Sequence, residues 1–276
     1  MSAGANSAFD FSIHSTIFLE VFREDADGTL QVSSGSAFLL GFTAKQKTER
    51  YLITCQHVIE GAKRIILYFL EETHDKKFVR IPVTLEAPEA YFVHINDPTI
   101  DLACCNISRI ETVLVSANRK PHYFLFHDGQ FPDETNIEKM DSVEEVYYFG
   151  YPKGVYDRYN FTPIARKGIT ASPYRLDFDG RPCFIIDGQI YAGSSGSPVI
   201  LVHRRIQNVE GVLKQVACGV TFLGMLIEGM RFHSLLFKKD GTLLQEEEKY
   251  FEQPLGLGVV IKARCIQNFL ADLQAA

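Results

Sequence analysis

The sequence contains no run of about 18 unbroken apolar residues, the length that a membrane-spanning helix needs. Its first residues, MSAGANSAFDFSIH, lack the positively charged start and the continuous apolar segment of a signal peptide. Internal repeats and low-complexity tracts are absent as well. We therefore expect no membrane partner and no secretion signal.

The chain also has fewer basic than acidic residues. The chain has 28 Lys and Arg against 34 Asp and Glu, a net charge of −6 and an isoelectric point near 5.8. This balance argues against a nucleic-acid partner, which would call for a basic surface. Apolar residues make up 46% and charged residues 22%, which is typical of an ordered globular protein and excludes extensive disorder.

The cysteines form neither a CxxC pair nor a Cys/His cluster at zinc spacing, so we expect no metal and no cofactor. Most stand in apolar, strand-like contexts, which favours buried free thiols over a disulfide framework. Free thiols are typical of a reducing compartment, and we expect a cytoplasmic location. The six cysteines occupy positions 55, 104, 105, 183, 218 and 265.

Most of the chain consists of short runs rich in Val, Ile, Phe and Tyr, separated by turn residues such as Asp-Gly pairs. Many evenly spaced short strands favour an all-β sandwich or barrel. The predicted strands cover residues 15–22, 35–42, 51–55, 64–70, 77–85, 144–149, 182–186, 198–202 and 213–223.

Helical periodicity is scarce and is clearest in the tail, 263–273, where apolar side chains recur at helical spacing. The polar stretch 126–142 could join two halves of similar size, and we expect two domains, 1–130 and 131–276, that form one unit. The charged segment 238–253 suggests a long surface hairpin or loop.

The tract YAGSSGSPVI, residues 191–200, places serines between glycines directly ahead of an apolar run. Glycine on both sides of the Ser194-Ser195 pair permits a tight turn that exposes a side chain and its backbone N–H. The N–H groups of Gly193 and Ser195 could then converge on one oxygen. A reactive serine also needs a base, a group that orients the base, and donors for the developing oxyanion. Taken alone, the tract is more typical of a small-residue turn.

Two further residues could complete such a site. His57 stands where the run 51–55 ends and a short helix is expected, so its imidazole can face a cleft. Asp101 directly precedes an apolar run, where a carboxylate is costly unless an imidazole N–H or a similar donor pairs with it. Asp97 is its rival but lies in a turn-like Asn-Asp-Pro context. The histidines without a comparable setting are His14, His74, His94, His122, His127, His203 and His233.

In order along the chain, these stretches resemble the motifs of trypsin/chymotrypsin-like serine proteases, the PA clan. FGYPKG and RKGITASP narrow the similarity to bacterial trypsin-like peptidases that include the HtrA-type proteases. The resemblance spans about 33–224. It rests on SGSAF (34–38), YLITCQHVI (51–59), DLA (101–103), FGYPKG (149–154), RKGITASP (166–173) and GSSGSP (193–198).

This resemblance implies two antiparallel β-barrels, with the active site in the cleft between them and a C-terminal α-helix. It makes His57 the general base, Asp101 its orienting partner and Ser195 the nucleophile, with the amides of Gly193 and Ser195 as the oxyanion hole. His57 and Asp101 would belong to the first barrel and Ser195 to the second. The implied activity is that of a serine endopeptidase acting on protein or peptide substrates through an acyl-enzyme. Inside a cell such an enzyme would need control, so we expect a regulated protease, with a regulatory protein as one candidate partner.

The sequence departs from the secreted trypsins at the positions that serve their activation. Ser194 replaces the aspartate that pairs with a new N-terminus after zymogen cleavage, and Val58 stands where a disulfide cysteine would follow His57. The chain after Gly224 is too short for a PDZ domain, so we expect a peptidase unit without one.

For substrate binding, the resemblance implicates Gln189 as the floor of the primary pocket, and Phe222, Leu223 and Gly224 as the strand that pairs with substrate. The bulk of this strand would narrow the pocket toward small or apolar side chains. A neutral floor does not predict a preference for Arg or Lys.

Three other interpretations stay open at this point. The same scaffold could be catalytically silent or latent and act as a protein-binding module. The same triad could serve another acyl transfer, such as ester hydrolysis. An α/β-hydrolase needs G-x-S-x-G and the order Ser, acid, His, whereas Ser197 replaces the second glycine here.

Overall fold

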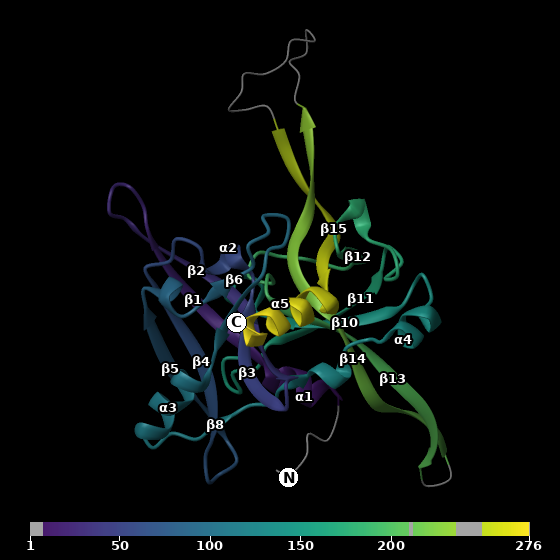
Figure 1. Ribbon diagram of the computed structural model, residues 1–276, viewed down its shortest axis with the longest axis horizontal. Coiled ribbons are helices and arrows are strands. Elements are labelled where there is room, and N and C mark those ends of the chain that lie inside the picture. The colour runs from purple at the N-terminus through teal and green to yellow at the C-terminus, as the bar shows by residue number, and fades with distance from the viewer. Residues whose placement is uncertain (1–7, 210–211, 236–249, 276) are drawn as a thin grey trace.

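The computed structural model describes residues 8–209, 212–235 and 250–275, and most of them lie in antiparallel strands (Figure 1). Each of the nine predicted β-rich runs overlaps a strand, and the strands form two sheets followed by a C-terminal helix. The prediction of the fold class is therefore confirmed. Of the charged segment predicted as a hairpin or loop, residues 238–249 lie outside the described residues.

The first sheet is built from the N-terminal half of the chain. Its hydrogen-bonded order is β5-β4-β1-β2-β3-β7-β6, with β8 paired to β4 and β9 to β2. In β4 buried side chains alternate with more exposed ones, as expected for a strand with one face on the core. The strands are β1 (Thr16–Glu24), β2 (Leu30–Ala44), β3 (Lys47–Thr54), β4 (Arg64–Glu72), β5 (Phe78–Glu86), β6 (Val93–His94), β7 (Ala103–Asn106), β8 (Pro121–His122) and β9 (Phe126–His127).

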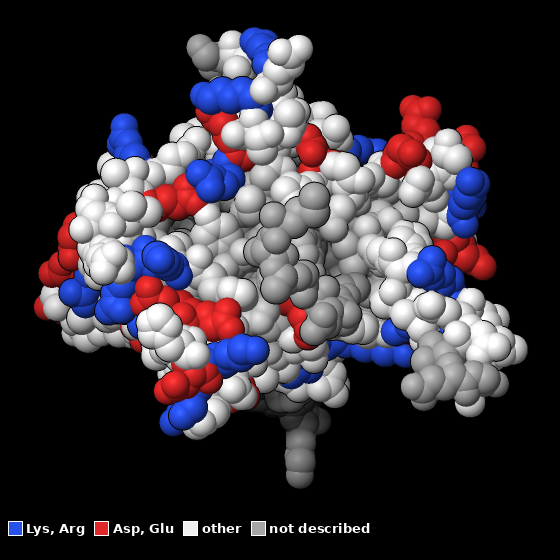
Figure 2. All heavy atoms as spheres, turned by 90° about the horizontal axis from the view of Figure 1, so that it is seen from below, with Lys and Arg blue, Asp and Glu red and all other residues white. Residues whose placement is uncertain are grey.

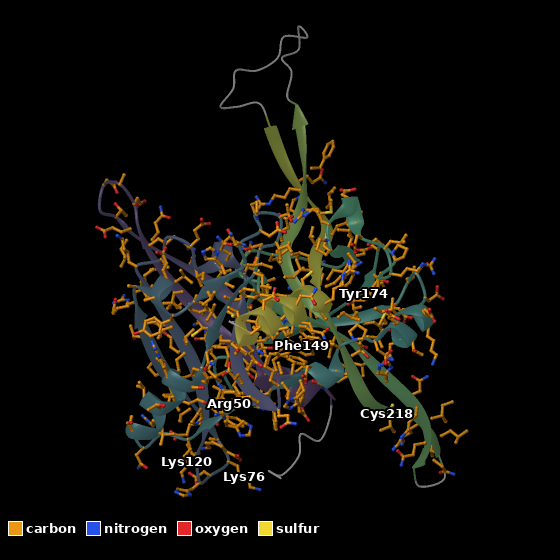
Figure 3. The ribbon with its side chains drawn as sticks, in the orientation of Figure 1. Arg50, Lys76, Lys120, Phe149, Tyr174 and Cys218 are labelled. Atoms are coloured by element: carbon orange, nitrogen blue, oxygen red, sulfur yellow. The ribbon has the colours of Figure 1, made fainter. Side chains whose placement is uncertain are left out.

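The second sheet closes into a barrel in the order β10-β11-β12-β15-β14-β13. Three of its strands extend past the barrel as two projecting ribbons, β13–β14 and β14–β15 (Figure 1). The exposed Cys218 lies on the β13–β14 ribbon (Figure 3). The strands are β10 (Glu145–Gly150), β11 (Ile164–Thr170), β12 (Cys183–Asp187), β13 (Ser197–Val209), β14 (Val212–Leu235) and β15 (Tyr250–Lys262).

A shared apolar core joins the two sheets. Phe222 of β14 packs against Phe38, Phe126 and Phe131, with ring centroids 5.1 to 5.3 Å apart. Because Phe38 and Phe126 belong to the first sheet, these rings bury apolar surface across the boundary between the sheets. A smaller cluster fills the second barrel around Tyr174, which Figure 3 labels there.

The predicted tail helix is present as α5 (Ala263–Ala275), and it buries Cys265, Ile266, Phe269 and Leu270. A short helix also follows the run that carries His57, as predicted. Three helices were not predicted from the sequence, because each is short and only α3 has clear amphipathic spacing. The remaining α-helices are α1 (Ala8–Ser15), α2 (Gln56–Ile59), α3 (Ser108–Ser116) and α4 (Glu134–Lys139). The predicted division at residue 130 stays a prediction, and it falls between β9 and β10.

All six cysteines are free, and five of them are buried. In the described part of the chain, no helix is both long and apolar enough to cross a bilayer. Acidic and basic side chains are interspersed on the face shown in Figure 2, so this face carries both signs of charge.

Candidate active site

His57 and Asp101 are brought together by the pairing of two strands. β3 ends at Thr54, and α2 begins two residues later, so His57 lies in the first turn of that helix. Thr54 pairs with Ala103 at the start of β7, which places the loop containing Asp101 beside the strand end. The two residues are 44 positions apart in sequence, yet this register makes them neighbours.

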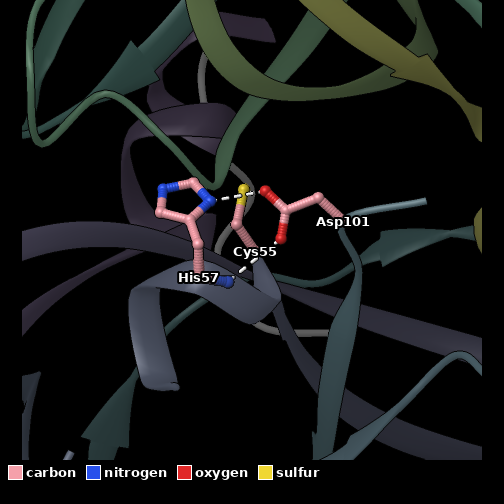
Figure 4. Close-up of side chains that lie close together, drawn as sticks. All are labelled: Cys55, His57 and Asp101. Atoms are coloured by element: carbon pink, nitrogen blue, oxygen red, sulfur yellow. Dashed lines mark hydrogen bonds and ion pairs between the residues drawn. The ribbon is translucent and has the colours of Figure 1, made fainter. Parts of the chain in front are cut away.

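The carboxylate of Asp101 contacts His57 twice (Figure 4). Its Oδ2 lies 2.5 Å from Nδ1 of the imidazole, and its Oδ1 accepts the backbone N–H of His57 at 3.0 Å. Burial alone would raise the pKa of Asp101. Hydrogen bonds from the His57 ring and the nearby backbone, together with the charge of the ring, outweigh burial and lower this pKa below its ordinary value.

Arg23 of β1 holds the other end of the short helix α2. Its guanidinium donates to the backbone carbonyls of His57 and Val58 at 2.9 and 2.8 Å, and to that of Glu60 at 2.9 Å. The last carbonyls of a helix have no partner within the helix, so these bonds satisfy groups that would otherwise need water. Arg23 thereby fixes the backbone from which His57 projects.

Ser195 lies in a turn that only glycine can build at its two flanking positions. Gly193 and Gly196 have φ angles of +86° and +89°. A Cβ on Gly196 would lie 1.8 Å from the carbonyl oxygen of Ser36, so the turn is pressed against β2 of the first sheet. Ser195 itself is half-buried and lines the cleft described below.

The same turn is tied in place by Ser36 and by the segment after β10. The Ser36 hydroxyl donates to the Gly193 carbonyl at 2.8 Å and accepts a hydrogen bond from the Tyr151 N–H at 3.0 Å. The backbone N–H of Ser36 donates to the Ser195 carbonyl at 3.0 Å. The N–H of Lys153 donates to the Ala192 carbonyl at 2.6 Å.

The bond from Lys153 to the Ala192 carbonyl sets the direction of the Gly193 N–H. In a trans peptide the C=O and the following N–H point in opposite directions. Because the Ala192 carbonyl points to Lys153, the N–H of Gly193 points away from it. Among the described residues, the N–H groups of Gly193 and Ser195 have no acceptor.

A cleft of about 1140 Å³ is lined by the predicted catalytic and oxyanion-hole residues. Its lining includes His57 and Asp101 from the first half of the chain, and Gly193 and Ser195 from the second. The second half of the chain also contributes Lys153, Arg181, residues 190–192 and 227–231, and the β15 residues Pro254, Gly256 and Leu257.

The predicted substrate-binding residues do not line this cleft. Phe222 and Leu223 are fully buried in the core, and Gly224 is pressed against the Ile261 carbonyl. The side chain of Gln189 is turned toward Arg166 and Tyr191, at 3.5 and 3.2 Å, and does not line the cleft.

The physical reason is the register of β14. Ser197 pairs with Leu226, and the N–H of Gly196 donates to the Leu226 carbonyl at 2.8 Å. The β14 residues that run beside the Ser195 turn are therefore those after Leu226, not those before it. The length of β14 and two register shifts in its pairing with β13 have no clear signature in the sequence.

The sequence analysis did not identify Ile190, although this residue shapes the cleft. It lies over Gly229 and Gly258, which pair across β14 and β15. A Cβ on Gly229 would lie 3.1 Å from the Ile190 side chain, and one on Gly258 would lie 2.9 Å from it. The two glycines leave a hollow at the cleft wall, and Ile190 fills it. The signal in the sequence was the pair of glycines, Gly229 and Gly258, because a glycine inside a strand often marks a site where another group approaches closely.

Residues 35–206 match the family model of the trypsin-like peptidase domain. This match covers more than half of the chain, so the protein belongs to the trypsin-like peptidase family.

Known structures and curated proteins add the following comparisons. The active form of the Rv3671c protease from M. tuberculosis is 16% identical, with a TM-score of 0.48 over 94% of this chain and 81% of that one. A serine endoprotease from Yersinia pestis is 14% identical, with a TM-score of 0.47 over 99% and 67%. The MamO protease domain from Magnetospirillum magneticum is 13% identical, with a TM-score of 0.45 over 95% and 98%. A search of curated proteins found no match.

Proposed function

We propose that the protein is a serine endopeptidase in which His57, Asp101 and Ser195 form the catalytic triad. The observation that carries this proposal is the Asp101–His57 hydrogen-bonded pair, which lines the same cleft as Ser195. Membership of the trypsin-like peptidase family supports it, and all three residues lie within the matched segment, 35–206.

In the proposed reaction, His57 acts as the general base. Asp101 accepts a hydrogen bond from the N–H at Nδ1, which leaves the lone pair of Nε2 available. Nε2 takes the proton of the Ser195 hydroxyl as its oxygen attacks the substrate carbonyl, and later gives it to the leaving amine. Water then attacks the acyl-enzyme and releases the second product, with His57 again as base.

The amides of Gly193 and Ser195 would stabilise the oxyanion formed in both steps. The Gly193 N–H is already turned away from Lys153 by the hydrogen bond that the Ala192 carbonyl accepts. Donors held in place before the reaction need no reorganisation during it, which is why such groups contribute strongly to the rate. This hole would form without the buried ion pair of the secreted trypsins, since Ser194 is neutral.

The substrates would be proteins or peptides with a small side chain at the residue before the cleaved bond. Ile190 fills the hollow over Gly229 and Gly258, which leaves little depth for a long side chain.

The free cysteines support a reducing compartment, and we place the enzyme in the cytoplasm on this basis. Because the Ser195 turn is held without zymogen cleavage, control would come from narrow specificity or from a regulatory protein.

A fluorophosphonate probe tests the proposed nucleophile directly. We expect labelling of the wild-type chain and none of Ser195→Ala. Ser34→Ala is the matched control, because Ser34 lines the same cleft but lacks glycines on both sides. His57→Ala should lower kcat by roughly 10⁴ or more. Normal turnover by His57→Ala would overturn the assignment, and absence of labelling at any pH would indicate a silent scaffold that binds proteins.

A peptide library then reads the substrate class. Cleavage sites should show small residues at the position before the cut. Hydrolysis of an ester panel with no cleavage of any peptide would indicate a different acyl transfer.

A further inference from the structure

Cys55 is a buried thiol next to the triad that the proposed mechanism does not use. It is the residue between β3 and α2, it has no exposed surface, and its Sγ lies 3.6 Å from the Leu226 carbonyl oxygen. Burial, followed by the nearby charge of Asp101, raises the pKa of this thiol well above its ordinary value.

Three metal-ligating atoms meet at this point (Figure 4). Sγ of Cys55, an imidazole nitrogen of His57 and a carboxylate oxygen of Asp101 all lie within 4.8 Å of one another. Among the described residues, no other group of three such side chains meets this condition. The sequence did not indicate the group, because Asp101 comes from another strand connection.

We propose that Cys55, His57 and Asp101 form an inhibitory binding site for a divalent cation of the zinc type. Sulfur, imidazole nitrogen and carboxylate oxygen are the ligands that Zn²⁺ takes in proteins, and three protein ligands leave the fourth position to water. Harder cations such as Mg²⁺ and Ca²⁺ prefer oxygen ligands and do not fit this set.

Modest movements would make the three atoms fit the ion, and the Cys55 thiol would release its proton to solvent as Sγ binds. With zinc bond lengths, ligand atoms in a tetrahedral site are about 3.2–3.8 Å apart. Nδ1 and Oδ2 would separate from their present 2.5 Å, and Sγ already lies within 4.8 Å of its two co-ligands. The ion would enter from the cleft, since the side chains of His57 and Asp101 are 50% and 26% exposed.

The bound ion would switch off the proposed peptidase, so this part of the inference rests on the proposed function. With a metal on Nδ1, the neutral imidazole carries its proton on Nε2 and can no longer accept the Ser195 proton. The ion also takes the Asp101 carboxylate that orients the ring.

The first test is spectroscopic and does not depend on activity. It uses the full chain with Ser195→Ala, which prevents self-cleavage, and Cys218→Ser, which removes the exposed thiol. Co²⁺ replaces Zn²⁺ as the probe, because a cobalt–thiolate bond gives a charge-transfer absorption that nitrogen and oxygen ligands do not. We expect this absorption, and its loss on Cys55→Ala. Cys183→Ala removes a buried thiol of the second sheet and should keep it.

The second test uses the chain with Ser195 intact and Cys218→Ser. We expect Zn²⁺ to inhibit peptide cleavage reversibly. In the Cys55→Ala variant, the Zn²⁺ concentration that halves the cleavage rate should rise about 10-fold or more. The reference for each variant is its own cleavage rate in the presence of a chelator. Cys183→Ala should leave it unchanged. Cys55→Ser, with a similar volume and a poor zinc ligand, serves if the alanine variant does not fold.

Two results would overturn the metal site: no cobalt–thiolate absorption at saturating Co²⁺, or equal zinc inhibition with and without Cys55. If the chain cleaves no peptide, the cobalt spectrum alone decides. A chain that cleaves peptides without a cobalt–thiolate absorption loses the metal site and keeps the proposed function.

Discussion

At the scale of single residues, Asp101 links stability to pH. Its pKa is lowered in the folded chain by the His57 ring and backbone amides, against the effect of burial. The folded state therefore favours the ionised carboxylate. This contribution is present above the unfolded pKa of about 3.9 and is lost as the pH falls through the lower folded value.

We expect Asp101→Asn to be less stable than the wild type at pH 7, with the difference shrinking as the pH falls below about 4. Urea unfolding of both proteins at several pH values measures it. A difference that stays constant down to acid pH would contradict the assigned interaction.

Ile190 is the residue that we expect to set the primary specificity. Ile190→Ala would open the hollow over Gly229 and Gly258. Each methylene accommodated in such a pocket contributes about 1–3 kcal/mol, so kcat/KM for Leu relative to Ala before the cleaved bond should rise about 10-fold or more. A peptide pair differing at this position provides the measurement. Ile206→Ala, on the exposed β13–β14 ribbon, is the control and should leave the ratio unchanged.

At the scale of elements, α2 depends on a residue far from it in sequence. Arg23 bonds two carbonyls of α2 and that of Glu60 directly after it, and a lysine could not reach all three with one ammonium group. We expect Arg23→Lys to lower kcat about 10- to 100-fold with a smaller change in KM, since His57 is displaced rather than lost. Steady-state kinetics measure this split. Arg205→Lys, on the exposed ribbon, is the control and should have the kinetics of the wild type. A change in KM alone for Arg23→Lys would contradict a role of Arg23 through His57.

The Ser195 turn depends in the same way on β2. Ser36→Ala removes the hydroxyl that binds the Gly193 carbonyl and the Tyr151 amide. If this releases the Gly193 amide from its orientation, kcat should fall by up to about 10²–10³, the cost of one oxyanion donor. Ser34→Ala, two residues earlier, is the matched control. A kcat of Ser36→Ala equal to that of the wild type would show that the turn keeps its shape without the Ser36 hydroxyl.

These elements also show what the sequence could and could not predict. Periodicity and turn residues located the strands, because apolar side chains must face the core, and motif order identified the family to which the chain belongs. Arg23, Ser36 and Ile190 went unnoticed, since their contacts are to backbone or to glycines far along the chain. The sequence did not show which part of β14 lines the cleft, because register depends on how long β14 runs beside β13.

At the scale of the whole molecule, the cleft exists only if the two sheets keep their relative position. Besides the shared core, the segment after β10 lies on the first sheet through Arg80 of β5. The guanidinium stacks over Tyr68 at 3.5 Å and over Tyr156 at 5.0 Å, and it donates to the Tyr156 hydroxyl at 2.7 Å. Tyr156 belongs to the same segment as Lys153, whose amide fixes the Ala192 carbonyl.

Arg80 should therefore affect both stability and catalysis. We expect Arg80→Ala to lower the free energy of unfolding by about 2–3 kcal/mol, from the lost stacking and the charged hydrogen bond. It should also lower kcat at a temperature where the variant is fully folded, because the segment that positions Ala192 is loosened. Arg80→Lys keeps the charge but loses the planar stacking, so its stability and its kcat should lie between those of the wild type and of Arg80→Ala. Chemical denaturation and single-turnover kinetics on the same samples separate the effects. A full loss of stability with unchanged kcat would mean that the segment holds the sheets together without transmitting order to the Ser195 turn.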